Sequence, residues 1–135
     1  MSNLKAFLHP VQGDETQEVV ISKRFVGEDG KPAPFRIRAL TQDENARISK
    51  QSMRLVKGGK RGEKELDAET YSNRIVVEAT VEPDFRSEEM CKAYSVVDPL
   101  DVPGRMLYAG EYNKLMDAIM KLSHFGDDLE DEVKN

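Results

Sequence analysis

The stretch VVISKRFVGEDGKPAPFRIRAL, residues 19–40, decides the fold because it holds the clearest strand–turn–strand pattern of the chain. Apolar side chains recur at every second position on both sides of a turn that contains Gly30, and such alternation is typical of strands with one buried face. The pattern predicts one strand over about 18–26 and a second over about 34–40, joined as a β-hairpin. Lys23 interrupts the apolar face of the first strand, so we expect an edge position or a bulge there.

The outer face of this hairpin is basic. Arg24 lies on the first strand, and Arg36 and Arg38 alternate on the second strand with the inward-facing Phe35 and Ile37. An unpaired strand edge with basic side chains suits β-augmentation or an acidic partner. The alternative is that the three arginines are simply solvated, which is the usual state of charged residues on an outer face. We take Arg24, Arg36 and Arg38 as partner-binding candidates.

A cluster of about four to five helices is expected after the hairpin. The sequence TQDE at 41–44 fits a capping box, which predicts a helix over about 42–56. Asp67 is placed to cap a helix over about 68–81, and Ser87 caps a short one that reaches Tyr94. The last helix, over about 111–122, is the most strongly amphipathic segment, and its apolar stripe consists of Tyr112, Leu115, Met116, Ile119 and Leu122.

Methionines on this last helix offer adaptable contact surface, because their side chains are flexible and polarizable. Met120 lies off the centre of the stripe, and Phe125 follows the helix. We take Met116, Met120 and Phe125 as further partner-binding candidates. The alternative is plain core packing, which is the more common state of an apolar stripe.

Two segments have the composition of irregular structure. KGGKRGEKE, residues 57–65, combines three glycines with six charges, which predicts a flexible loop. It lacks the spacing of a phosphate-binding loop. VDPLDVPGRMLYAGEY, residues 97–112, predicts short helical pieces and turns, with Met106, Leu107 and Tyr108 as their buried part.

Length and composition predict one α+β domain over residues 1–125, with a lead-in over 1–17 and an acidic, flexible tail over 126–135. No apolar run approaches the roughly 20 residues needed to span a bilayer, and the opening residues do not resemble a signal peptide. Cys91 is the single cysteine, which excludes an intrachain disulfide and fits a reducing cytoplasm.

Charge is divided unevenly along the chain, whose formal net charge is −5. Residues 1–64 contain 13 Lys/Arg and 8 Asp/Glu, whereas residues 65–135 contain 7 and 17. This asymmetry fits either a small nucleic-acid-binding or regulatory module, or a dipolar protein whose halves attract each other in folding or self-association. The basic half has no Arg/Lys run interleaved with aromatic residues, which favours the second alternative, and we expect no nucleic acid as partner.

Residues equipped for catalysis or metal binding do not gather in the sequence. The two histidines, His9 and His124, are not at metal-ligand spacing with each other or with Cys91. A cysteine nucleophile needs a nearby base, and Cys91 has no histidine within its own helix. Carboxylate pairs such as Glu88 and Glu89 are adjacent in sequence, so they are not held across a cleft. We therefore predict no catalytic, cofactor-binding or metal-binding residue, and a protein that is not an enzyme.

Four blocks of the chain resemble the XkdN-like family of phage tail assembly chaperones, which is found in contractile-tailed phages and prophages of Gram-positive bacteria. The blocks are LKAFLHPV at 4–11, EVVISKRFVGEDGKPAPFRIRALTQDEN at 18–45, ETYSNRIVVEATVEPDF at 69–85 and LYAGEYNKLMDAIMKLSHF at 107–125. The likeness covers nearly the whole chain in the same order, and the glycine-rich segment 57–65 departs from it.

The resemblance implies a non-enzymatic protein that acts in the bacterial cytoplasm during assembly and is absent from the mature virion. Its expected partner is the tape measure protein, with the tail tube protein as a second partner, and self-association into a homo-oligomer is compatible with this role. A minor structural tail protein is the remaining alternative. The resemblance carries over no active-site residue.

Overall fold

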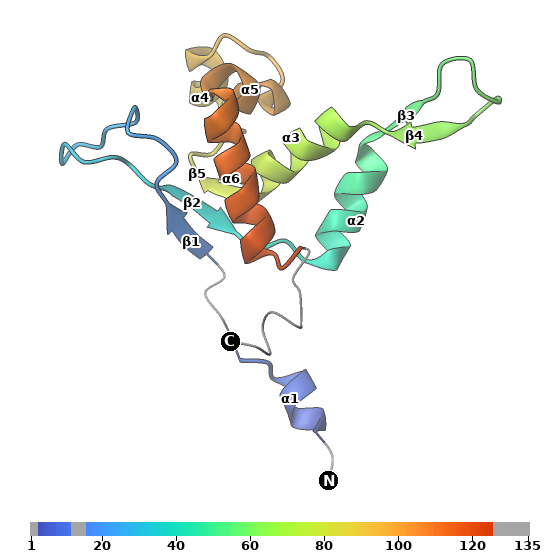
Figure 1. Cartoon of the computed structure of the whole chain (residues 1–135), viewed down its shortest axis with the longest axis horizontal. Coiled ribbons are helices and arrows are strands. Elements are labelled where there is room, and N and C mark those ends of the chain that lie inside the picture. Colours follow the sequence, from blue (N-terminus) through green and yellow to red (C-terminus); the bar gives the residue numbers. More distant parts are fainter. Residues whose placement is uncertain (1–2, 12–15, 126–135) are drawn as a thin grey trace.

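The structure, a computed structural model, describes residues 3–11 and 16–125. A three-stranded antiparallel sheet in the order β1–β2–β5 packs against helices that surround α3 (Figure 1). The predicted α+β class, with an N-terminal hairpin followed by helices, is confirmed. The acidic tail predicted over 126–135 lies outside the described residues.

The predicted hairpin is present, but its first strand lies earlier in the chain than expected. β1 (Thr16–Val19) pairs antiparallel with β2 (Phe35–Arg38), and Val19 stands opposite Phe35. The second strand follows the predicted alternation, because the side chains of Phe35 and Ile37 are buried. The prediction of a first strand that continues to residue 26 is wrong.

The chain leaves the ladder after Val19 because the side chains that follow find partners elsewhere in the domain, and pairing returns only as an isolated bridge between Val26 and Pro32. Ile21 enters the core, and the ring of Phe25 packs against that of Phe35 with 5.7 Å between centroids. Arg24 hydrogen-bonds to Glu111, which is 87 residues away in the sequence. Gly30 forms the turn at the tip, at φ +78°. The segment predicted as the end of the first strand is therefore a long loop that is fastened to the core.

α2 (Gln42–Gln51) begins with the predicted capping box. The hydroxyl of Thr41 accepts from the Glu44 N–H at 3.2 Å, and the Glu44 carboxylate accepts from the Thr41 N–H at 3.1 Å. The predicted extension of this helix to Val56 is wrong. Ser52 ends the helix, and its buried hydroxyl donates to the Ile48 carbonyl at 2.7 Å.

A second hairpin stands where the sequence predicted the end of a helix and a flexible loop. β3 (Met53–Leu55) pairs antiparallel with β4 (Lys64–Leu66), and Figure 1 shows this β3–β4 hairpin projecting from the ends of α2 and α3, away from the other elements. Gly58 and Gly62 adopt φ +73° and +80°, which glycine enters without steric cost. The loop predicted over 57–65 is therefore the turn of a hairpin, and its last residues belong to β4.

α3 (Ala68–Ala79) begins at the predicted cap, where the Asp67 carboxylate accepts from the Thr70 N–H at 3.2 Å. The helix ends two residues before the predicted position. β5 (Thr80–Glu82) follows without a loop and pairs with β2. No local pattern indicated this third strand, since its three residues follow directly on a strong helical stripe.

The remaining helices follow the predictions closely. Ser87 caps α4 (Glu88–Ala93), and its hydroxyl accepts from the Met90 N–H at 3.2 Å. The predicted short pieces are the 3₁₀ helix η1 (Pro99–Asp101) and α5 (Val102–Met106), and α6 (Ala109–Leu122) begins two residues earlier than expected.

Two further details differ from the predictions. Tyr108, predicted to be buried with Met106 and Leu107, is 67% exposed, because its ring lies over the guanidinium of Arg24. Within the predicted lead-in, α1 (Leu4–Leu8) is a short helix with no buried residue.

The core is built around α3 and α6. The buried residues of α3 are Ile75, Val76, Val77 and Ala79, and those of α6 are Leu115 and Ile119. These side chains join Phe35, Ile37 and Phe85 in one cluster. Since α6 also contacts β1 and β2, it covers one face of the sheet while packing on α3 (Figure 1).

The Arg38–Glu44 ion pair should make the free energy of unfolding depend on pH in the acidic range. The Arg38 guanidinium donates to the Glu44 carboxylate at 2.6 Å, and this hydrogen bond lowers the pKa of Glu44 from 4.5 to about 2. A folded-state pKa below the unfolded value adds stability above about pH 4.5, and this contribution is lost as the pH falls toward 2. Glu44→Gln should therefore flatten the fall of the urea midpoint between about pH 5 and 2.5.

Glu28→Gln, at an exposed glutamate of the β1–β2 loop, is the matched control and should leave the pH profile unchanged. A Glu44→Gln profile as steep as that of the wild type would contradict this account of the ion pair.

Candidate functional site

Arg24, the first partner-binding candidate, is held by groups of its own chain. Its guanidinium makes two hydrogen bonds to the Glu111 carboxylate, at 2.5 and 3.0 Å, and one to the Met106 carbonyl at 3.1 Å. Its charged carbon also lies 4.8 Å from the Phe25 ring centroid and 4.2 Å from that of Tyr108, within cation–π range. The Arg24 hydrogen bond lowers the pKa of Glu111 to about 2. Arg24 thus fastens the β1–β2 loop to the start of α6.

Arg36 and Arg38 also face acidic groups of the same chain. Arg36 lies 3.8 Å from the Glu82 carboxylate, and its side chain stays exposed. Arg38 reaches both Glu44 and Glu78, at 2.6 and 3.1 Å. The three candidate arginines therefore do not form one patch of unpaired charge, and Arg36 is the one most accessible to a partner.

The three candidates near the end of α6 are half-buried. Met116 packs on the core cluster, while Met120 lies beside the stripe formed by Leu115 and Ile119. Phe125 lines a cavity of about 210 Å³ together with residues at the start of α2. The end of α6 and the start of α2 are thus neighbours, which brings the Phe125 ring close to a second helix.

Glu78 is the centre of the largest ion-pair group among the described residues. Its carboxylate accepts from Arg38, Arg47 and Arg86, which come from β2, α2 and the segment before α4. Burial alone would raise the pKa of Glu78, but the hydrogen bonds from Arg86 and Arg47 outweigh it, so the pKa lies below its usual value. One carboxylate therefore joins three separate parts of the fold.

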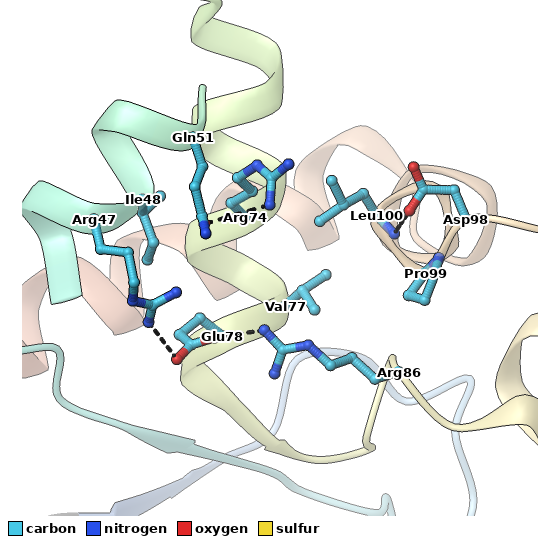
Figure 2. A pocket seen from close by; sticks show the side chains of 10 residues that line it. All are labelled: Arg47, Ile48, Gln51, Arg74, Val77, Glu78, Arg86, Asp98, Pro99 and Leu100. Atoms are coloured by element: carbon cyan, nitrogen blue, oxygen red, sulfur yellow. Dashed lines mark hydrogen bonds and ion pairs between the residues drawn. The ribbon is translucent and has the colours of Figure 1, made fainter. Parts of the chain in front are cut away.

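A cavity of about 280 Å³ opens beside this group. Figure 2 shows Arg47 and Arg86 meeting at Glu78 from opposite sides, with Arg74 next to Gln51 on the same wall. Apolar side chains from α2, α3 and η1 complete the lining together with Asp98. Because Glu78 pairs with Arg47 and Arg86, two of the three lining arginines, we interpret this cavity as part of the structural network that holds α2, α3 and the segment before α4 together.

Apolar surface is exposed mainly on two projecting or peripheral elements. α1 and the residues after it expose Leu4, Phe7, Leu8 and Val11, the last at 96%. The β3–β4 hairpin exposes Met53, Leu55 and Leu66. Large exposed apolar groups of this kind mark surfaces for protein contact when they lie together.

The described residues offer little for covalent chemistry. Cys91 is half-buried, and its sulfur lies 4.0 Å from the Phe85 carbonyl oxygen. Within residues 3–11 and 16–125, no group of three or more His, Cys, Asp or Glu side chains is arranged to hold a metal ion. In the same part of the chain, no helix has the length and apolar character needed to cross a bilayer.

The sequence did contain signals for the two elements that it left unassigned. Leu4, Leu8 and Val11 recur at helical spacing, and Phe7 adjoins them. Met53, Leu55 and Leu66 alternate with charged residues on both sides of a glycine-rich turn, which is typical of a short hairpin. Both patterns are only a few residues long. The first lay in the predicted lead-in, and the helix predicted over 42–56 covered the start of the second.

Similarity to known proteins agrees with this architecture. Residues 4–135 match the family model described as "Phage XkdN-like tail assembly chaperone protein". The phage-like element PBSX protein XkdN of Bacillus subtilis (strain 168) is 37% identical over 138 residues, covering 96% of this chain and 93% of that protein. Protein YqbN of the same strain is 39% identical over 131 residues, covering 93% and 87%.

The crystal structure of YqbN is similar to this structure as well. The two superpose with a TM-score of 0.71 at 33% identity, over 89% of this chain and 95% of the YqbN chain. The chain therefore belongs to the XkdN-like family of phage tail assembly chaperones.

Proposed function

We propose that this protein binds the tape measure protein of a phage or prophage tail and keeps it soluble while the tail tube assembles around it. It acts by contact alone, without catalysis, in the bacterial cytoplasm, and it leaves before the virion is complete. The tail tube protein is the second partner in this proposal, met when the tube grows along the tape measure.

Exposed apolar surface on α1 and the β3–β4 hairpin is the observation that carries the proposal. A chaperone of this kind must cover apolar stripes of another chain, and it needs accessible apolar side chains to do so. The formal net charge of −5 keeps such a protein soluble despite this surface. Family membership supports the same role in tail assembly.

The proposal predicts that the tape measure protein depends on this chain for solubility. Binding to the client removes its apolar surface from water, and mass action then shifts the client away from aggregation. When the tape measure protein of the same phage is expressed with and without this chain, the soluble fraction should rise at least about fivefold with it, and the two should copurify. A tape measure protein that is equally soluble in both cells would contradict the proposal.

Substitutions at two neighbouring positions on α6 should distinguish loss of partner binding from loss of the fold. Ile119 is fully buried, so Ile119→Asp places an unpaired charge in the core and should cost about 4 kcal/mol or more, which unfolds the domain. Met120 is half-buried, so Met120→Asp should keep the fold and weaken capture of the tape measure protein. Circular dichroism reports the fold, and copurification reports capture.

Asn113→Asp adds the same charge at an exposed position nearer the start of α6, and it should change neither measurement. If the Met120→Asp variant captures the tape measure protein as well as the wild type does, this end of α6 is not part of the contact surface.

A further inference from the structure

The β3–β4 hairpin has two chemically different faces. Residues that stand opposite each other in an antiparallel pair point to the same side. Met53 is paired with Leu66, and Leu55 with Lys64, so the three apolar side chains share one face. The middle pair of the ladder is Arg54 and Glu65, whose side chains occupy the other face.

The polar face is satisfied within the chain, whereas the apolar face is open. Arg54 lies 3.2 Å from the Glu65 carboxylate and 3.8 Å from that of Asp67. On the apolar face, Met53 is 41% exposed, Leu55 66% and Leu66 42%. A two-stranded hairpin is marginally stable by itself in water, so an exposed apolar face on one is unusual without a contact to make.

The base of the hairpin is fixed to the domain. The Asp67 N–H donates to the Ser52 carbonyl at 2.7 Å, closing the two strands where they leave α2 and α3. The Ser52 side chain is buried against α2 through its bond to Ile48, and Asp67 caps α3. The hairpin is therefore held at its base, in the direction in which Figure 1 shows it projecting.

The β3–β4 hairpin also carries a local excess of positive charge. Residues 53–66 contain five Lys or Arg side chains and two Glu side chains, an excess of three positive charges in a chain whose net charge is −5. Lys57, Lys60 and Arg61 surround the turn, and Lys64 lies beside Leu55 across the ladder. An apolar centre with a basic rim favours an apolar partner surface with an acidic rim.

We propose that the apolar face of the β3–β4 hairpin is the docking surface for an amphipathic helix of the client whose apolar stripe is flanked by Asp and Glu. This inference rests on the proposed function, since it names the surface that holds the tape measure protein. The spacing fits: Met53 and Leu55 are two residues apart on a strand, roughly 6–7 Å. Side chains four apart on a helix rise about 6 Å along its axis.

Leu55→Asp tests the docking surface directly. The variant places a charge at the most exposed residue of the apolar face without touching the core, so it should keep the circular dichroism spectrum and melting temperature of the wild type. Its capture of the tape measure protein in copurification should fall at least about tenfold. Val97→Asp is the matched control, because Val97 is 99% exposed and lies outside the hairpin; its capture should equal that of the wild type.

The outcomes separate this inference from the proposed function. If the wild type and Leu55→Asp capture the tape measure protein equally, the docking surface is wrong and the chaperone proposal stands. If the wild type captures none, the proposed function fails and the inference fails with it. Loss of capture in both Leu55→Asp and Val97→Asp would also overturn the hairpin as the specific surface.

A pair of synthetic helices tests the charge of the partner. Two peptides carry the same leucine stripe, one flanked by Glu and one by Lys, and their affinities are measured by fluorescence anisotropy at low salt. The Glu-flanked peptide should bind at least about tenfold more tightly, and Lys60→Glu/Arg61→Glu should remove most of that difference. Equal binding of the two peptides would overturn the acidic partner. Tight binding of duplex DNA that depends on Lys60 and Arg61, with peptide binding absent, would assign the basic rim to nucleic acid instead.

Discussion

The fold depends on α3 and on the single carboxylate within its buried stretch. Ile75, Val76, Val77 and Ala79 are all buried, and Glu78 between them accepts from three arginines. The Glu78 side chain is only 14% exposed, so leaving its charge unpaired would be unfavourable, and the three arginines remove that cost. Each arginine comes from a different element, so the pairing of one side chain aligns the sheet, α2 and the segment before α4 with α3.

The direct passage from α3 into β5 extends this constraint to the sheet. Thr80 stands opposite Ile37 two residues after Glu78, so the end of the helix fixes the register of the third strand. α6 then closes the core from the other side with Leu115 and Ile119. This packing buries most apolar residues of α3 and the centre of the apolar stripe of α6. What remains accessible lies largely on α1 and the β3–β4 hairpin, which is why we propose a contact function for these elements.

The sequence predicted those parts of the fold whose signals are local. The alternation in β2, the caps at Thr41, Asp67 and Ser87, and the stripe of α6 each depend on residues a few positions apart. The first strand was misplaced because the partner of Arg24 is 87 residues away, and no local pattern contains that information. β5 was missed for a similar reason, since its pairing with β2 spans more than 40 residues.

The candidate site was harder to predict than the fold, because exposure is a property of the folded chain. The strand pattern predicted the outward direction of the Arg38 side chain correctly. It could not predict that this side chain forms ion pairs with Glu44 and Glu78. Conversely, Met53 and Leu55 were assigned to the helix predicted over 42–56, and only the antiparallel register shows that they share one open face with Leu66. The predicted charged contact residues thus have acidic partners within the chain, while the open apolar surface lies where the end of a helix and a loop were predicted.

Hydrogen–deuterium exchange of this chain, with and without the tape measure protein bound, tests the central claim most directly. In this account, the client covers the projecting apolar elements and the end of α6, and it leaves α3 unchanged. Amides of residues 53–66 should exchange more slowly in the complex, while those of α3 keep their rates. Unchanged exchange across the hairpin in a complex that does form, with slowing confined to other segments, would contradict the account.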